Sequence, residues 1–294
     1  MTEATDILFP GAPQATYPSV PAHLRLAVES IERDGWAVLP GQIPASGCAA
    51  MRAAVAGLLA AETAEIGGAE NMKRIGDEGV SRSPFLRDDR FVGPAALPDV
   101  LAVARHFLGA VVQLNLQRIV VNVPGLSHGA GVWHRDHSYQ DFTTSRPVSL
   151  TALAMLDGSR PENGAPSLLP GSHRFEKFPT FEYARSRATR ALCAPGDVLL
   201  IDSAIFHRTE PNPGPESRHT VVTIYTVPLI RQNVDYPKLL AGRWADDPVL
   251  GPLMGYATAM PASDLEYRRT KLDRGRRVAR DRSVTPASTP AKDA

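Results

Sequence analysis

The chain has few cysteines, almost no net charge and no long apolar run. Its two cysteines, Cys48 and Cys193, stand far apart in the sequence, so they provide no disulfide framework. The formal net charge of +1 favours neither nucleic acid nor a membrane surface as a partner. The most apolar helical stretch, Cys48 to Ala61, is interrupted by Arg52 and is shorter than the roughly 20 residues of a membrane-spanning helix. We therefore expect a soluble protein.

The length and the two ends of the sequence indicate one large domain. A chain of 294 residues can bury a sizeable core, and no internal repeat is visible. The N-terminus lacks a signal-peptide pattern, so a cytoplasmic location is expected. Residues 1–20 predict an irregular arm, residues 21–267 the single domain, and residues 268–294 a basic, disordered tail. Asp273 and Asp281 interrupt the basic residues of this tail, which favours a solvated segment over a nucleic-acid-binding one.

Hydrophobic periodicity predicts helices that flank a β-rich core. A helix that opens at Pro21 is expected to end at Gly35, a good C-terminal cap, and Trp36 to Leu39 reads as a short strand. Two further helices are predicted from about Ala45 to Glu65 and from Asp99 to Leu108. From Val111 to Val227 the pattern is typical of strands separated by Gly/Pro turns.

A His-x-Asp motif and one distant histidine predict a metal site. His134 and Asp136 are two residues apart, so on an extended strand their side chains project to the same face. His207 follows a Pro-Gly turn and an apolar strand, and it can supply a third ligand. A lone His-x-Asp is a weak signal, and a single histidine is more often structural. Two imidazoles and one carboxylate that leave open positions are typical of non-haem Fe(II) oxygenases.

Several segments spaced between residues 25 and 230 share one further pattern. They are Asp34–Gly41, Trp133–Asp136, Glu162–Arg174, Pro195–Asp197, Phe206–Thr209 and Arg218. This pattern resembles the phytanoyl-CoA dioxygenase family of Fe(II)/2-oxoglutarate-dependent oxygenases. The resemblance implies a mainly β fold with flanking helices, built on a double-stranded β-helix (jelly-roll) core, in which His134, Asp136 and His207 hold iron.

The resemblance also implies 2-oxoglutarate as cosubstrate. The distal carboxylate of 2-oxoglutarate needs a fixed cation, and an arginine fork binds a carboxylate bidentately. Arg218 follows His207 by eleven residues, as in the family, and Thr209 is placed to add a hydroxyl. Gln117 matches a family position that contacts the cosubstrate. Asn122 is the poorer candidate, because its odd offset from Gln117 puts it on the other face of the strand.

The expected reaction converts 2-oxoglutarate and O2 to succinate and CO2 while an unactivated C–H bond of a small organic metabolite is oxidised, most simply by hydroxylation. Asp136 is present, which disfavours halogenation, whereas desaturation, ring closure and epoxidation stay open. No catalytic residue beyond the three metal ligands is predicted.

Substrate contacts are expected from loops near the motif. Tyr139 and Phe142 directly follow it, and Trp133 within it either contacts substrate or packs beneath the metal. Arg82 lies in a long charged segment, Met72 to Arg90, which fits either an active-site lid or a solvated surface loop.

Two other functions remain open. A cupin-like metal enzyme that does not use 2-oxoglutarate is one, although Arg218 and Thr209 would then have no assigned partner. A catalytically silent member that binds a metabolite is the other, and the intact set of metal ligands argues against it.

Overall fold

The computed structural model of the protein describes residues 20–125, 131–136 and 142–272. The chain divides into two compact units, Met1–Tyr256 and Ala257–Ala294. The described part of the second unit contains a helical stretch over residues 264–272. All described residues that we predict to form the site belong to the first unit.

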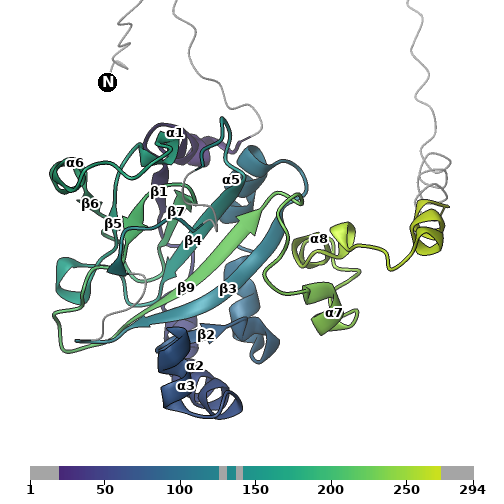
Figure 1. Ribbon diagram of the computed structural model, residues 1–294, viewed down its shortest axis with the longest axis horizontal. Coiled ribbons are helices and arrows are strands. Elements are labelled where there is room, and N and C mark those ends of the chain that lie inside the picture. The colour runs from purple at the N-terminus through teal and green to yellow at the C-terminus, as the bar shows by residue number, and fades with distance from the viewer. Residues whose placement is uncertain (1–19, 126–130, 137–141, 273–294) are drawn as a thin grey trace, which may run out of the picture. The chain divides into compact units, whose positions relative to one another are not determined.

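Two antiparallel sheets form the framework of the first unit (Figure 1). The larger sheet has six strands, in the order β1 (Trp36–Leu39), β7 (Val198–Asp202), β4 (Ser149–Met155), β9 (Arg218–Thr226), β3 (Gln113–Asn122) and β2 (Val80–Arg82). The smaller sheet has three strands, in the order β6 (Thr189–Arg190), β5 (Ser167–Leu168) and β8 (His207–Arg208). Strands adjacent in space are distant in sequence, as a jelly-roll topology requires.

The two faces of the six-stranded sheet have different partners, because successive side chains of a strand point to opposite sides. One face of β4 contributes Leu150, Ala152 and Ala154 to the core that the sheet shares with the helices. The opposite face contributes Met155 to a second core, together with Leu168 of the smaller sheet. We call the space between the two sheets the barrel interior.

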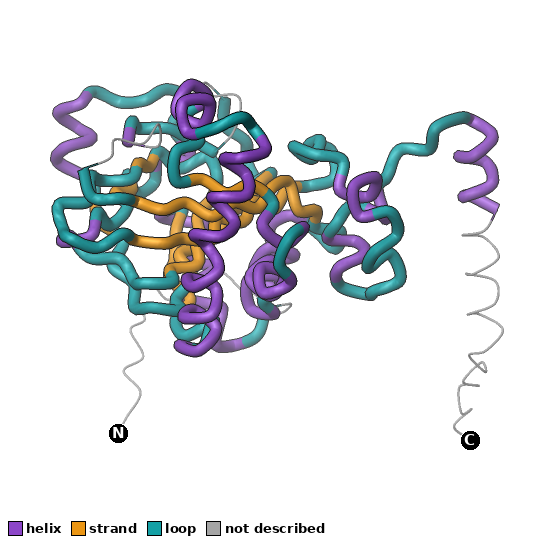
Figure 2. Tube along the Cα trace, turned by 90° about the horizontal axis from the view of Figure 1, so that it is seen from below, coloured by secondary structure: helices purple, strands orange, loops and turns teal. Residues whose placement is uncertain are grey.

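Helices cover the outer face of the larger sheet (Figures 1 and 2). The α-helices described in the first unit are α1 (Arg25–Asp34), α2 (Ala45–Glu65), α3 (Ala69–Ile75), α4 (Val92–Ala95), α5 (Pro98–Leu108), α6 (Phe181–Arg187), α7 (Tyr236–Leu240) and α8 (Leu250–Leu253). Short 3-10 turns occur at Ala22–Leu24, Pro84–Leu86, Asp89–Phe91, Pro161–Asn163, Ser172–Arg174 and Tyr256–Thr258. Val28 and Ile31 of α1 and Val100 of α5 are among the helical residues packed into this core.

Most predicted elements are confirmed. The strand Trp36–Leu39 and the helix Ala45–Glu65 have the predicted bounds. Gly35 ends α1 with a left-handed backbone (φ 85°), a conformation that favours glycine. The charged segment from Met72 to Arg90 is not a continuous loop, because it contains β2, which pairs with β3.

Neither cysteine is paired in the structure: Cys48 and Cys193 are both buried and free. Within the described ranges, no single helix is long and apolar enough to cross a membrane, whereas the bent pair 89–95 and 98–108 meets that test by length and composition.

Candidate metal centre

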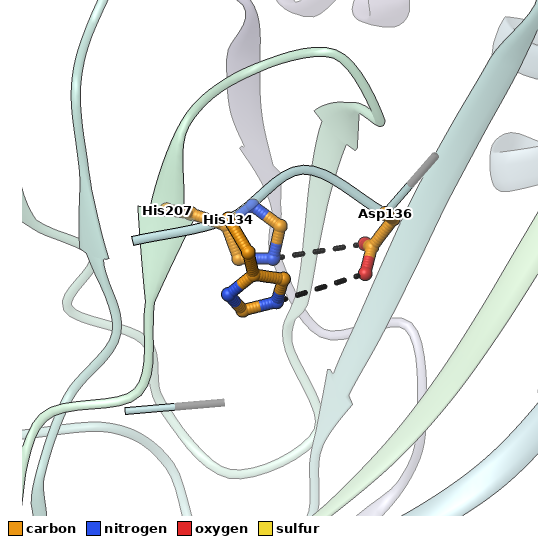
Figure 3. Close-up of side chains that lie close together, drawn as sticks. All are labelled: His134, Asp136 and His207. Atoms are coloured by element: carbon orange, nitrogen blue, oxygen red, sulfur yellow. Dashed lines mark ion pairs between the residues drawn. The ribbon is translucent and has the colours of Figure 1, made fainter. Parts of the chain in front are cut away.

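The three predicted metal ligands lie together beside the smaller sheet (Figure 3). His134 and Asp136 come from the segment between β3 and β4, and His207 begins β8. The backbones of His134 and His207 form an isolated antiparallel bridge, so the fold aligns the two imidazoles independently of any ligand. Their ring centroids are 4.4 Å apart.

The side chains converge with their potential ligand atoms facing one another. Nε2 of His134 lies 4.0 Å from Oδ1 of Asp136, and Nε2 of His207 lies 3.7 Å from Oδ2. One potential ligand atom from each residue lies within 4.8 Å of the other two. This spacing lets one metal ion contact all three residues.

Backbone carbonyls set the tautomer of both histidines. Nδ1 of His134 lies 2.8 Å from the carbonyl oxygen of Val132, and Nδ1 of His207 lies 3.1 Å from that of Ile205. A carbonyl oxygen only accepts hydrogen bonds, so each Nδ1 carries the proton when the ring is neutral. The Nε2 lone pairs are then free for a metal, which is the arrangement that metal-binding histidines adopt.

The charge state of the cluster also suits a cation. Burial by itself raises the pKa of the Asp136 carboxyl, but interactions with His207 and Arg118 outweigh it and hold this pKa below its ordinary value. Burial lowers the pKa of His207 to about 4. Near neutral pH the cluster therefore contains an ionised carboxyl at Asp136 and a neutral imidazole at His207. This donor set fits Fe(II).

Arg218 supplies a buried cation on β9. The residue is 3% exposed, and its guanidinium donates to the carbonyl oxygens of Asn163 (3.2 Å) and Gly164 (3.0 Å) and to Oγ1 of Thr220 (2.7 Å). Among the described residues it forms no ion pair, and burial lowers its pKa to about 10. A buried guanidinium bound only to neutral acceptors fits the carboxylate of a ligand.

Strand register corrects the expectation for Gln117. Asn122 pairs directly with Arg218, so the two share the interior face, whereas Gln117 pairs with Thr223 on the outer face. The Gln117 amide donates to the carbonyl oxygen of Phe91, in the helical layer. The structure therefore places Gln117 on the helical side of the sheet and Asn122 on the interior side.

Two interior polar groups were not predicted from the sequence, namely the amide of Asn122 and the guanidinium of Arg118. Asn122 donates to the carbonyl oxygen of Glu210 (3.1 Å), while its buried Oδ1 has no partner among the described residues. Nη2 of Arg118 lies 3.7 Å from Oδ1 of Asp136. The even spacing of Arg118, Val120 and Asn122 is the sequence signal for this shared face, but only the pairing partner reveals which face is interior.

Thr209, the other predicted cosubstrate contact, lies two residues beyond His207 and is half-buried. Its main chain continues directly from β8. It remains a prediction as a cosubstrate contact.

The predicted substrate residues divide into different environments. Tyr139 lies outside the described residues. Phe142 is 42% exposed and its carbonyl accepts a hydrogen bond from Arg135. The Trp133 ring lies 5.8 Å from that of Phe178 (between centroids), and the Arg208 guanidinium lies over it. Its role as a substrate contact stays a prediction.

Arg82 is engaged in an ion pair. Its guanidinium makes two hydrogen bonds to Asp77, at 2.5 and 2.7 Å, and its backbone N–H donates to Glu62. The guanidinium of Arg82, a predicted substrate contact, is thus already paired with the carboxylate of Asp77.

Comparisons with known proteins agree with this geometry. The family described as phytanoyl-CoA dioxygenase matches residues 31–220. A Mycobacterium tuberculosis protein, described as uncharacterized, is 26% identical over 178 residues, which cover 59% of this chain and 64% of that protein. The ectoine dioxygenase of Stutzerimonas stutzeri is 24% identical over 229 residues, which cover 67% of this chain and 75% of the relative.

Solved structures share the fold. EctD from S. alaskensis, crystallised with 2-oxoglutarate and 5-hydroxyectoine, superposes with a TM-score of 0.60 at 23% identity, covering 76% of this chain and 82% of EctD. The epimerase SnoN, in complex with Fe3+, α-ketoglutarate and nogalamycin RO, gives a TM-score of 0.54 at 20% identity, covering 70% of this chain and 84% of SnoN. The expected jelly-roll oxygenase fold is confirmed.

Proposed function

Because the chain belongs to the phytanoyl-CoA dioxygenase family, we propose that it is an Fe(II)/2-oxoglutarate-dependent dioxygenase that oxidises a C–H bond of a small organic metabolite. The observation that carries this proposal is the combination of a His-Asp-His cluster with a buried Arg218 on β9 that forms no ion pair with any described residue. A metal site alone fits many enzymes. Together with the metal site, the buried Arg218 fits a ligand that chelates the metal at one end and bears a carboxylate at the other.

The residues have distinct proposed roles. His134, Asp136 and His207 hold Fe(II), while Arg218 binds the distal carboxylate of 2-oxoglutarate, with Thr209 as an additional hydroxyl donor. When bound, Fe(II) and 2-oxoglutarate supply O2 activation, with 2-oxoglutarate converted to succinate and CO2.

Burial increases the contribution of Arg218 to binding. Its guanidinium is 3% exposed, so a carboxylate that reaches it exchanges water for a fixed donor in a region of low dielectric constant. The carbonyls of Asn163 and Gly164 hold the fork in place before the ligand arrives. The guanidinium therefore needs little rearrangement when a carboxylate binds.

Arg118 faces the metal from the same interior side. Its Nη2 lies 3.7 Å from Oδ1 of Asp136, and its buried Nε has no hydrogen-bond partner among the described residues. We assign it to contact a ligand that sits beside Asp136. The relatives named above act on ectoine or bind nogalamycin, which supports a small molecule as the substrate class.

The test is product formation from candidate metabolites. Purified protein is supplied with Fe(II), 2-oxoglutarate and O2, and the substrate should raise succinate release and gain one oxygen atom by mass spectrometry. Asp136→Ala should lose both signals. Product without succinate, or equal turnover by Asp136→Ala, contradicts the proposal; succinate with loss of two hydrogens from the substrate assigns desaturation in place of hydroxylation.

A further inference from the structure

Three buried hydroxyl groups form a chain that ends on Asp136. Oγ1 of Thr151 lies 2.7 Å from Oδ2 of Asp136 and 2.9 Å from Oγ of Ser203, and Oγ of Ser203 lies 2.6 Å from Oγ of Ser149. Thr151 and Ser203 are 0% exposed and Ser149 is 1% exposed. Buried hydroxyls that are fully shielded from water depend on one another for hydrogen bonding.

The proton positions in this chain follow from elementary bonding rules. An ionised carboxylate only accepts, so Thr151 donates its single hydroxyl proton to Asp136. Thr151 then has no proton left for Ser203, so Ser203 donates to Thr151. By the same rule Ser149 donates to Ser203. The chain therefore points in one direction, toward the carboxylate.

Main-chain hydrogen bonds tie the same residues together. The N–H of Asp136 donates to the carbonyl oxygen of Ser203 (3.0 Å), and the N–H of Ser203 donates to that of Ser149 (3.2 Å). Ser149 and Thr151 belong to β4, a central strand of the larger sheet. The segment that carries Asp136 is thus fastened to rigid structure through both its backbone and its side chain.

We propose that Thr151, Ser203 and Ser149 are positioning residues that fix the orientation of the Asp136 carboxylate toward the metal, with Thr151 holding Oδ2. This inference rests on the proposed iron site. Groups that orient metal ligands typically change metal affinity by about 10–100-fold when they are removed. The hydroxyl chain orients the carboxylate before the metal binds. The Asp136 side chain therefore does not have to rotate on binding, and no free energy is lost in ordering it.

The direction of the chain predicts a graded response. Thr151→Val removes the donor to Asp136 and leaves Oδ2 unsatisfied in a buried position. Ser203→Ala leaves that donor in place and removes only its support, and Ser149→Ala removes a support one step farther away. The expected order of metal-affinity loss is therefore Thr151→Val, then Ser203→Ala, then Ser149→Ala.

A matched control is available on β9. Thr226 pairs with Ser149 across the sheet, is 2% exposed, and its Oγ1 has no hydrogen-bond partner among the described residues. Thr226→Val is the same chemical change in the same sheet, at a hydroxyl that makes no hydrogen bond to Ser149, Thr151 or Ser203. It should leave metal binding unchanged.

The experiment is anaerobic titration of the metal-free protein with Fe(II) against a competing chelator, followed by visible spectra of the Co(II)-loaded protein. Thr151→Val should weaken Fe(II) binding by about tenfold or more and alter the Co(II) bands. Thr151→Ser, which restores the hydroxyl, should return both readings close to the wild type. These readings report ligand geometry, which a purely structural role of Thr151 would not change.

The proposal is overturned if Thr151→Val keeps the wild-type Fe(II) affinity and Co(II) spectrum, or if Thr226→Val loses as much affinity as Thr151→Val. Should Thr151→Val fail to fold, Ser203→Ala decides: a reduced affinity supports the chain and an unchanged affinity overturns it. Failure of the wild-type protein to bind Fe(II) instead contradicts the proposed function itself. Normal wild-type binding with no effect of the variants contradicts only the positioning role.

Discussion

His134 and His207 are joined by a pair of reciprocal main-chain hydrogen bonds, each N–H donating to the other's carbonyl oxygen at 3.0 Å. The bridge fastens the motif segment to β8 without using either imidazole. Replacement of one side chain should therefore remove a metal ligand and leave the local backbone in place. Substitutions of these side chains should therefore test metal binding without disturbing the fold.

His207→Ala should abolish Fe(II) binding while the protein stays folded. The lost side chain is buried, so a destabilisation of about 1–2 kcal/mol is expected. Metal content after anaerobic loading and the thermal unfolding midpoint measure the two effects. His23→Ala, at an exposed histidine paired with Asp99, is the control and should bind iron normally. Full iron occupancy in His207→Ala would remove this residue from the site.

Arg218→Lys should raise the KM for 2-oxoglutarate by about tenfold or more, although it keeps the positive charge. Lysine lacks the planar fork that binds a carboxylate through two parallel hydrogen bonds. Fe(II) affinity should stay unchanged, because Arg218 is assigned to the cosubstrate and not to the metal. The exposed Arg190 of β6 provides the control, Arg190→Lys. An unchanged KM in Arg218→Lys would show that the cosubstrate carboxylate lies elsewhere.

The opposite faces of β3 predict opposite outcomes for two amides. Asn122→Ala should raise the KM for 2-oxoglutarate, because Asn122 pairs directly with Arg218 across the two strands and shares its interior face. Gln117→Ala should lower stability without changing this KM, because its amide bonds to the carbonyl of Phe91 in the helical layer. Steady-state kinetics and denaturant unfolding of both variants distinguish the faces. The reverse result would mean that the strand register is wrong.

Asp202 should make stability depend on pH. Burial raises the pKa of its carboxyl to about 6 in the folded protein, above the ordinary value of about 3.9 in an unfolded chain. The folded state thus holds this proton more firmly, so the stabilisation is complete below about pH 4 and is lost as the pH rises through 6.

Asp202→Asn keeps an acceptor for the N–H of Ala204 but cannot ionise. It should therefore be more stable than the wild type at pH 7, by on the order of 2 kcal/mol, and similar to it at pH 4. Free energies of unfolding at the two pH values measure this difference. An equal effect of the substitution at both values would show that Asp202 does not titrate as described.

The sequence is most informative at positions where only one or a few residue types can fill a structural or chemical role. Gly35 was identifiable as a helix end because a left-handed backbone at a C-cap favours glycine. His134, Asp136 and His207 were identifiable because few other side chains make that donor set. The family resemblance then assigned distant segments of the chain to one site, which local sequence patterns alone could not do.

The features that could not be predicted from the sequence depend on pairing between distant strands. Alternation correctly separated Gln117 from Asn122, but the choice of the interior face required the register with Arg218 on β9. The hydroxyl chain joins Thr151 to Ser203, which are 52 positions apart and carry no motif. Buried polar networks of this kind follow from packing, which a single sequence does not display.

The most direct test of the proposed chemistry is an anaerobic titration of the metal-free protein with Fe(II) and then with 2-oxoglutarate. A visible iron-to-keto-acid charge-transfer band should develop in the wild type and be absent at the same concentrations in Arg218→Ala. Fe(II) that binds without any such band at saturating 2-oxoglutarate would contradict the assignment of the cosubstrate.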